Sequence, residues 1–557
     1  MFKRFLFIIV LAYANITAQV SVNPESIEFP QVFISLTDSA SFYIINNNEY
    51  PVTVNIAKLK AVYDLSDTLL LIPPEDSIIV WIKYHPNQNV IDADVVIIRS
   101  SDSTIGAAIN ITGSAKYDDI YDVTTFNKYD VELKSALNAL VINHISLGYN
   151  LARDKMFMEI DNQKVNGQGA SQNTLECVYT GRKAVGYTSR TDAQNNYNFN
   201  TEHTWPQSNF GENEPMKSDL YHLFPTDNPA NAIRSNYPFG KVIANVTWDS
   251  AGSKLGKNYL NQTVFEPRDV HKGDVSRSMF YFITRYPVNY GGFFNQIQEN
   301  VFREWNKLDP VGTVEANRNN AIASYQQKRN PFIDHPEFVD RIYSFTTNNI
   351  RPTIAKFDLL PSSLPFDSTV ITNTSVKNFF AINTGSAALI IDSINISDQR
   401  FQIPNLITSI DPYSATKLQI NFTPDSVKSY SAILTVFTNA GSKQINLSGI
   451  GKDNAVNMND EIQQPLTFTL SQNYPNPFNP STKISWQSSV GSWQTLKVYD
   501  VLGNEVAILV NEYKPAGSYE VEFNGHSDEG QTLSSGIYFY KIQCDDFVAV
   551  KKMVLLK

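Results

Sequence analysis

Two segments of the chain alternate apolar and polar positions over roughly a hundred residues each, the length of one sandwich domain. The first opens with "VSVNPESIEFPQV" and the second with "LLPSSLPFDSTV", and they end in the similar runs "INITGSAK" and "INLSGIGK". Clusters of Asn, Gly, Ser and Pro interrupt both segments. A period of two with such turn residues predicts antiparallel strands. We therefore predict two copies of one β-sandwich, at residues 19–115 and 353–452.

The region between the copies has a different pattern. Apolar residues there recur at helical spacing in four stretches, "DVELKSALNALVINHI", "DVSRSMFYFITRYP", "VFREWNKLDPV" and "VEANRNNAIASYQQKRNPF". Spacing of three and four residues is typical of amphipathic helices. Residues 119–350 are therefore predicted to form an α+β domain inserted between two all-β domains.

A third β pattern follows a polar linker. The linker covers residues 453–465, and residues 466–557 again alternate apolar and polar positions. This pattern predicts a further β-sandwich at the C-terminus. The predicted fold class is thus multidomain, with a central α+β domain between all-β sandwiches and a C-terminal β-sandwich.

Composition supports folded domains throughout most of the chain. With 557 residues the chain is too long for one hydrophobic core. Its 42% hydrophobic, 12% aromatic and 18% charged residues are unlike a disordered chain, which would carry more charge and fewer aromatics. The formal net charge of -10 argues against a protein that coats polyanions. Any nucleic-acid site must therefore be local.

The N-terminus has the form of a signal peptide. Lys3 and Arg4 precede the apolar run 5–14, and small residues surround Ala18. The run is too short for the roughly twenty residues of a membrane-spanning helix. We predict a signal peptide at 1–18, export, and no stable membrane insertion after cleavage. The two cysteines lie far apart in the sequence, so the exported chain is expected to rely on its cores and not on disulfides.

Both kinds of β segment resemble known modules. The two repeats resemble the immunoglobulin-like modules of many exported bacterial enzymes. The C-terminal segment, with "LSQNYPNPFNPSTKISW" and "GIYFYKIQCDDFVAVKKMVLLK", resembles the type A sorting domain of proteins exported by the type IX secretion system. That resemblance implies the type IX secretion machinery as a partner and a secreted or cell-surface location.

Candidate chemistry gathers in residues 201–242. We expect one strand to end near His203, "SDLYHLFPT" to form a second strand, and Asn228 to cap a helix with Pro229 at its first position. On that helix Asn228, Asn231 and Arg234 are three residues apart and share a face. Strand, strand and helix would form a hairpin with a helix across it.

These side chains suit phosphodiester hydrolysis. A neutral imidazole can take a proton from water, and a hard cation held by one carboxylate and one amide can neutralise the leaving oxygen. Glu202 and His203 are adjacent, however, and neighbouring residues of a regular strand point to opposite faces. We therefore predict an irregular backbone or a bulge at this point.

Five ordered blocks across 119–350 together resemble bacterial endonuclease I, nucleases of the His-Me finger (ββα-metal) class: "NTEHTWPQS", "SDLYHLFPTDNPANAIRSNYPFG", "FEPRDVHKGDVSRSMFYFITRYP", "WNKLDPV" and "RNPFIDHPE". The resemblance implies His203 as general base, with Glu202 and Asn231 holding one Mg²⁺, for which Mn²⁺ or Ca²⁺ are alternatives. It also implies cleavage of DNA, often with RNA, with little sequence preference, leaving 5′-phosphate ends.

The sequence departs from some relatives at two places. They have a longer basic loop after the "EH" strand that supplies a phosphate-binding arginine, whereas "GENEPMK" here is short and acidic. Tyr221 stands where relatives commonly have histidine, so Tyr221 and His222 receive no catalytic role, and His222 is expected to be packed or hydrogen-bonded. Arg277 and Arg234 are the candidate substrate contacts. The alternative for Arg277 is a structural ion pair.

Five other histidines are expected to be structural or on the surface: His85, His144, His271, His335 and His526. Two other functions remain open at this point. One is a catalytically inactive adhesion or binding protein built on a nuclease scaffold, and the other is a metal-dependent phosphodiesterase with a small substrate. The presence of Glu202, His203 and Asn231 together favours the nuclease.

Overall fold

The computed structural model describes residues 20–453, 468–525, 533–544 and 547–556. The predicted signal peptide and nearly all of the predicted linker lie outside these residues, as does His526. The chain divides into two compact units, one ending at Asp453 and one formed by the residues after it. Within the described residues no helix is long and apolar enough to cross a membrane.

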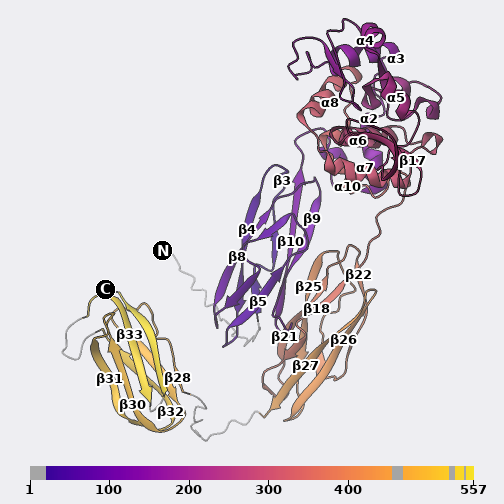
Figure 1. Cartoon of the computed structure of the whole chain (residues 1–557). Coiled ribbons are helices and arrows are strands. Elements are labelled where there is room, and N and C mark those ends of the chain that lie inside the picture. Colours follow the sequence, from indigo (N-terminus) through magenta and orange to yellow (C-terminus); the bar gives the residue numbers. More distant parts are fainter. Residues whose placement is uncertain (1–19, 454–467, 526–532, 545–546, 557) are drawn as a thin grey trace, which may run out of the picture. The chain divides into compact units, whose positions relative to one another are not determined.

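The first β region consists of two sheets around one core (Figure 1). One sheet has the order β1-β4-β8-β6, with β1 Val20–Asn23, β4 Asp38–Asn46, β8 Ser77–Tyr84 and β6 Tyr63–Leu65. The other has the order β2-β10-β9-β5-β7, with β2 Ser26–Glu28, β10 Gly106–Lys116, β9 Ile91–Arg99, β5 Val52–Ala57 and β7 Leu69–Ile72, while β3 Val32–Phe33 also pairs with β10.

The second β region repeats this topology strand for strand. Its sheets have the orders β18-β21-β25-β23 and β19-β27-β26-β22-β24, and β20 pairs with β27 as β3 pairs with β10. The strands are β18 Phe357–Leu360, β19 Ser363–Pro365, β20 Thr369–Val370, β21 Ser375–Asn383, β22 Leu389–Ile396, β23 Phe401–Gln402, β24 Ser409–Ile410, β25 Ser414–Phe422, β26 Ser429–Thr438 and β27 Gly441–Lys452. The predicted repeat is confirmed.

Alternation of buried and exposed positions explains most of these strands. In β5 every second residue is buried, as expected for a sheet with one face on the core and the other in solvent. In β9 five successive residues are buried, so this strand is covered on both faces. Its outward-facing Val95 and Ile97 pack with Leu360, Ile382 and Ala415 of the second β region. The two repeats therefore share a small apolar cluster.

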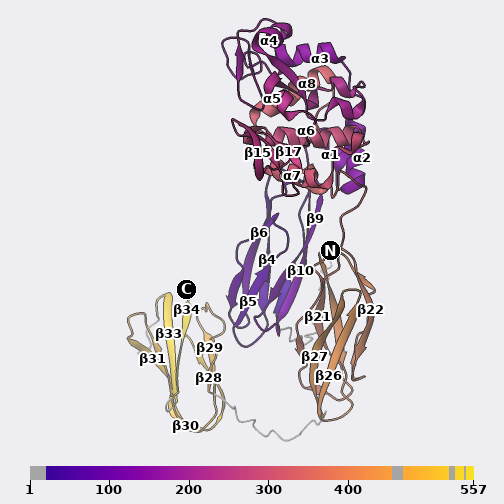
Figure 2. The ribbon, with the colours of Figure 1, turned by 45° about the vertical axis from the view of Figure 1, so that its right-hand side comes forward.

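The central region joins helices to short sheets around a large aromatic core. Its helices are α1 Asp122–Thr125, α2 Asp130–Val141, α3 Tyr149–Lys155, α4 Arg190–Tyr197, α5 Asn228–Arg234, α6 Lys272–Arg285, α7 Gln296–Leu308, α8 Thr313–Gln326, α9 Pro331–Asp334 and α10 Phe338–Arg341 (Figure 2). Its strands are β11 Thr174–Glu176, β12 Lys183–Val185, β13 Phe199–His203, β14 Leu223–Asp227, β15 Ala244–Ser250, β16 Ser253–Lys257 and β17 Thr263–Glu266. All four stretches predicted to be helical contribute to helices, namely α2, α6, α7 and α8.

The C-terminal unit again has two sheets around one core. Their orders are β28-β29-β32 and β31-β30-β33-β34. The strands are β28 Thr469–Leu470, β29 Thr482–Ser488, β30 Ser492–Tyr499, β31 Glu505–Lys514, β32 Gly517–Phe523, β33 Gly536–Cys544 and β34 Phe547–Leu555. Cys544 in β33 and Cys177 in the central region are both buried.

Candidate active site

The candidate site is built on the hairpin β13–β14 followed directly by α5. The strands pair antiparallel without interruption from Phe199 opposite Asp227 to His203 opposite Leu223. The predicted bulge at Glu202 and His203 is therefore wrong. Because the strand is regular, the two side chains leave it on opposite faces.

Two local boundaries also differ from the prediction. The second strand begins at Leu223, because residues 216–218 and 220–222 form short 3₁₀ turns instead of extended chain. The cap of α5 is Asp227, whose carboxylate accepts a hydrogen bond from the backbone N–H of Ala230 at 2.8 Å. Asn228 is the first helical residue, so the sequence prediction placed the cap one residue too late.

His203 is buried, with only 6% of its surface exposed. Its Nε2 lies 3.2 Å from the carbonyl oxygen of Lys217, and its Nδ1 lies 3.1 Å from the amide nitrogen of Gln207. A carbonyl can only accept, so the neutral ring carries its proton on Nε2 and presents Nδ1 as the acceptor. Burial, followed by the nearby His222, holds the pKa of His203 well below its usual value. The imidazole is therefore neutral.

Glu202 faces α5 and is also buried. Nε of Arg234 lies 3.0 Å from Oε1 of Glu202, and both side chains are almost completely enclosed. Burial raises the pKa of Glu202, while the charge of Arg234 opposes that rise. Despite the ion pair, Oε1 has no aligned hydrogen-bond donor within the described part of the chain.

Asn231 lies one turn before Arg234 on α5, and is half-buried. Among the residues that the structure describes, its side-chain amide makes no hydrogen bond of its own. No group of three or more His, Cys, Asp or Glu side chains among the described residues is arranged to hold a metal. The possible ligands here, the carboxylate of Glu202 and the unengaged amide of Asn231, supply the oxygen atoms that a hard cation with most of its water ligands prefers.

The two arginines predicted to contact substrate are engaged inside the protein. Arg234 donates to the carbonyl oxygens of Ser235 and Thr204, each at 2.6 Å, besides pairing with Glu202. Arg277 is fully buried and donates to both carboxylate oxygens of Glu315, at 2.7 and 2.6 Å. Neither guanidinium can reach a substrate phosphate without breaking these contacts. The structural ion pair, given above as the alternative for Arg277, is what the structure contains.

The remaining histidines of the central domain have structural partners. His222 is buried and its Nε2 donates to the carbonyl oxygen of Met216 at 2.6 Å, as expected. His144 lies beside Asp219, His271 beside Asp274, and His335 between two carboxylates. His85, in the first β region, is partly exposed beside Asp64.

Sequence reasoning missed several residues around His203. Gln207 follows it by four positions in "EHTWPQ", and Lys217 supplies the carbonyl that fixes its tautomer. Tyr149, more than fifty residues upstream, places its ring centre 5.6 Å from that of His203. The position of Gln207 within the "EH" block was a usable signal, but nothing local links Tyr149 to the site.

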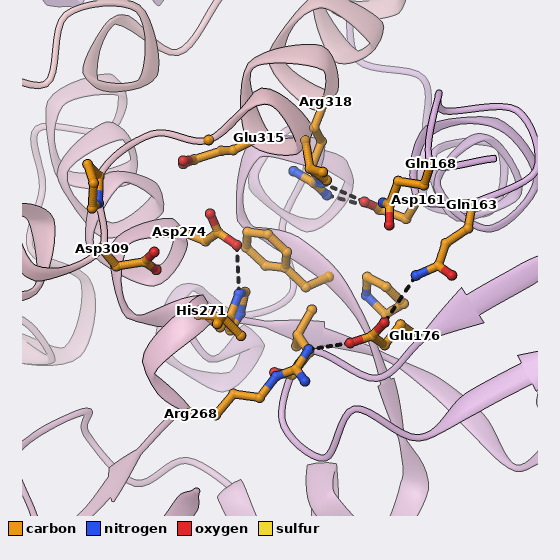
Figure 3. A pocket seen from close by; sticks show the side chains of 17 residues that line it. Asp161, Gln163, Gln168, Glu176, Arg268, His271, Asp274, Asp309, Glu315 and Arg318 are labelled. Carbon is orange, nitrogen blue, oxygen red and sulfur yellow. Dashed lines mark hydrogen bonds and ion pairs between the residues drawn. The ribbon is translucent and has the colours of Figure 1, made fainter. Parts of the chain in front are cut away.

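A separate cavity of about 350 Å³ lies on the same domain (Figure 3). Five carboxylates line it: Asp161, Glu176, Asp274, Asp309 and Glu315. Its two arginines are already paired, Arg318 with Asp161 at 2.8 Å and Arg268 with Glu176 at 2.6 Å. With more acidic than basic groups, this cavity repels phosphate. It is not the site at which a nucleic-acid backbone would bind.

The hairpin thus carries a neutral histidine on one face of β13, while the carboxylate of Glu202 on the other face lies against α5, the helix that carries Asn231. Residues 130–337 match the family profile described as Endonuclease I, and residues 472–556 match that of a secretion system C-terminal sorting domain. The chain belongs to the Endonuclease I family and is a nuclease. Its sorting domain places it outside the cell or on the cell surface and implies the type IX secretion machinery as a partner.

Curated relatives agree with this assignment. An "Extracellular ribonuclease" of Bacillus amyloliquefaciens is 32% identical over 255 residues, covering 42% of this chain and 81% of the relative. An "Extracellular ribonuclease" of Bacillus subtilis (strain 168) is 31% identical over 268 residues, covering 44% of this chain and 87% of the relative. A "Periplasmic deoxyribonuclease" of Aeromonas hydrophila is 25% identical over 196 residues, covering 31% of this chain and 75% of the relative.

Proposed function

We propose that this protein is a divalent-cation-dependent endonuclease that hydrolyses phosphodiester bonds of DNA and RNA with little sequence preference. The observation that carries the proposal is the fixed tautomer of His203, with Nδ1 presented as a proton acceptor. Relatives named as ribonucleases and as a deoxyribonuclease support both substrates. The hairpin with its helix is the arrangement expected of a His-Me finger.

In the proposed reaction Nδ1 of His203 takes a proton from the attacking water. Nδ1 accepts from the amide of Gln207 at 3.1 Å, and an attacking water would take the place of that amide as the donor. Glu202 and Asn231 would hold the cation. A bound Mg²⁺ would neutralise the charge that develops on the leaving oxygen. That oxygen becomes the 3′ hydroxyl of one product, and the phosphate stays on the 5′ end of the other.

Replacing the proposed base tests the mechanism directly. His203→Ala is expected to lower the rate of plasmid and RNA cleavage by roughly 10²- to 10⁴-fold while DNA binding persists, because proton abstraction and not affinity is lost. His85→Gln, at a partly exposed histidine of the first β region, serves as the control and should cleave normally. Unchanged cleavage by His203→Ala would show that another group is the base.

The proposed ligands are tested by metal titration. Glu202→Gln and Asn231→Ala are expected to require higher magnesium concentrations for half-maximal cleavage, because each removes one of few protein ligands. The wild-type protein should lose cleavage in a chelator and regain it when magnesium is restored. Wild-type titration curves in both variants would exclude the two residues from the ligand set.

A further inference from the structure

Three cationic side chains lie near Tyr149, whose ring contacts that of His203: Arg153, Arg190 and Lys217. Arg190 donates from Nε to Asp154 at 2.6 Å and from Nη1 to Gln194 at 3.2 Å. Lys217 pairs with Glu212, its Nζ lying 2.7 Å from Oε2. Both of these cations already have a protein partner, and a carboxylate balances each charge.

Arg153, on α3, has a different environment. Its guanidinium carbon lies 4.1 Å from the centre of the Tyr149 ring, and its Nη2 donates to the side-chain oxygen of Asn150 at 2.9 Å. Within the described residues it has no ion pair, and its buried Nε has no hydrogen-bond partner. A guanidinium carries five N–H donors in a planar fork, so donors remain that no protein carboxylate satisfies.

Tyr149 connects this arginine to the proposed catalytic histidine. The guanidinium of Arg153 lies over the ring of Tyr149. The Nζ of Lys217 lies 5.1 Å from the centre of the same ring. The Tyr149 ring contacts the His203 ring, with 5.6 Å between centres. Arg153 and Lys217 thus lie against the aromatic ring that contacts the proposed base.

We propose that Arg153, held over the ring of Tyr149, binds a non-bridging oxygen of the scissile phosphodiester, the one attacked by the water that His203 deprotonates. This inference rests on the proposed nuclease function and names the phosphate contact that the short acidic loop "GENEPMK" does not supply. The guanidinium fork matches phosphate geometry, and stacking on an aromatic ring holds it in place before substrate arrives. Contact with the backbone alone carries no base information, in agreement with cleavage of many sequences.

A positive charge at this point is also needed because the whole chain is acidic. With a net charge of -10, the protein as a whole does not attract a polyanion. Arg153 supplies this local attraction for a phosphate.

The first experiment measures binding in a cleavage-deficient His203→Ala background. Affinity for a short DNA duplex would be followed over a range of salt concentrations. Loss of one phosphate contact lowers the slope of log affinity against log salt by about 0.9, and Arg153→Ala in that background is expected to show this decrease. Lys155→Ala is the matched control, because Lys155 lies on the same helix but pairs with Glu159. Its slope should equal that of the parent.

The second experiment measures cleavage in the otherwise wild-type protein. Arg153→Ala is expected to lower kcat/KM by roughly 10- to 100-fold, the usual range for a lost charged hydrogen bond. Arg153→Lys keeps the charge without the fork, so it should retain the salt slope but lose part of kcat/KM. This conservative variant also keeps the test informative if Arg153→Ala folds poorly, which thermal unfolding would reveal.

The outcomes separate the two proposals. If the wild-type protein cleaves nucleic acid but Arg153→Ala and Arg153→Lys match Lys155→Ala in salt slope and kcat/KM, the phosphate role of Arg153 is wrong while the nuclease proposal stands. If the wild-type protein cleaves neither DNA nor RNA with magnesium present, both proposals fall. A reduced salt slope together with a reduced kcat/KM in Arg153→Ala, with neither change in Lys155→Ala, supports the inference.

Discussion

At the scale of single residues, adjacent positions in one strand have opposite chemical environments. Glu202 faces α5 and Arg234, and burial raises its pKa. His203 faces Lys217 and Gln207, and burial lowers its pKa. Desolvation disfavours the charged form of either group, so it acts in opposite directions on an acid and a base. The neutral histidine suits proton abstraction, and the carboxylate stays charged only with a cation beside it.

The ion pair of Glu202 leads to a prediction about Arg234. Arg234→Met is expected to lower the free energy of unfolding of the nuclease domain by about 3 to 5 kcal/mol, because it leaves a buried carboxylate without its counter-charge. If Glu202 also holds a metal, magnesium should raise the thermal midpoint of this variant more than that of the wild-type protein.

A partly exposed arginine provides the control for that prediction. Arg182→Met removes a guanidinium that is 41% exposed and lies 3.3 Å from Asp227. Its expected cost is about 1 kcal/mol or less, since such pairs are well solvated. Equal destabilisation of the two variants would contradict a special role for the Glu202–Arg234 pair.

At the scale of elements, buried polar contacts join helices that are distant in sequence. Arg277 of α6 contacts Glu315 of α8, and also donates to the side chain of Asn306 at 3.0 Å and the backbone carbonyl of Asp309 at 2.9 Å, both at the end of α7. Asp219 accepts hydrogen bonds from the hydroxyls of Tyr281 in α6 and of Tyr286 just after it, at 3.0 and 2.9 Å. These contacts hold α6 against the segment that carries the hairpin.

Arg277 is therefore predicted to matter for stability and not for substrate binding. Arg277→Met is expected to cost about 3 to 5 kcal/mol of unfolding free energy, because it leaves Glu315 buried and unpaired beside Asp274. Denaturant titration measures this loss, and salt titration of DNA binding should give the wild-type slope. A reduced slope at wild-type stability would restore the role in phosphate binding that the sequence suggested.

At the scale of the whole molecule, stability should depend on pH through buried histidines of the central domain. Burial lowers the pKa values of His144, His222 and His271, the last to about 3. In the unfolded chain these histidines bind protons near pH 6.5, whereas in the folded domain they stay neutral. The unfolding free energy therefore falls as the pH drops below about 6.5. The buried pair Asp274 and Glu315 has raised pKa values and acts oppositely, losing its contribution as pH rises.

Calorimetry on the full chain would test this dependence. The thermal midpoint of the nuclease domain is expected to fall by several degrees between about pH 7 and pH 5, which corresponds to roughly 2 kcal/mol or more. The C-terminal unit is an internal reference, because its sequence contains a single histidine, His526, whereas the central domain contains five. A parallel shift of both transitions, or a constant midpoint for the nuclease domain, would contradict the assignment.

Local pattern was sufficient for the elements of this protein. Period-two alternation identified both β repeats, and their identical strand orders follow from the same placement of apolar residues. Helical spacing located α2, α6, α7 and α8. Two local predictions failed: the bulge predicted at Glu202 and His203 is absent because β13 pairs regularly with β14, and Asp227 rather than Asn228 caps α5.

The sequence by itself determined the domain order, the strand and helix types, the family and the residues of the proposed catalytic set. Each of these depends on periodicity or on short ordered blocks, which neighbouring residues define. Only the tertiary structure decided which arginines are available, because that depends on partners such as Glu202, Glu315 and Tyr149. Burial and pairing are set by residues tens of positions away. The sequence therefore does not distinguish an arginine whose donors are all hydrogen-bonded inside the protein from one that faces solvent.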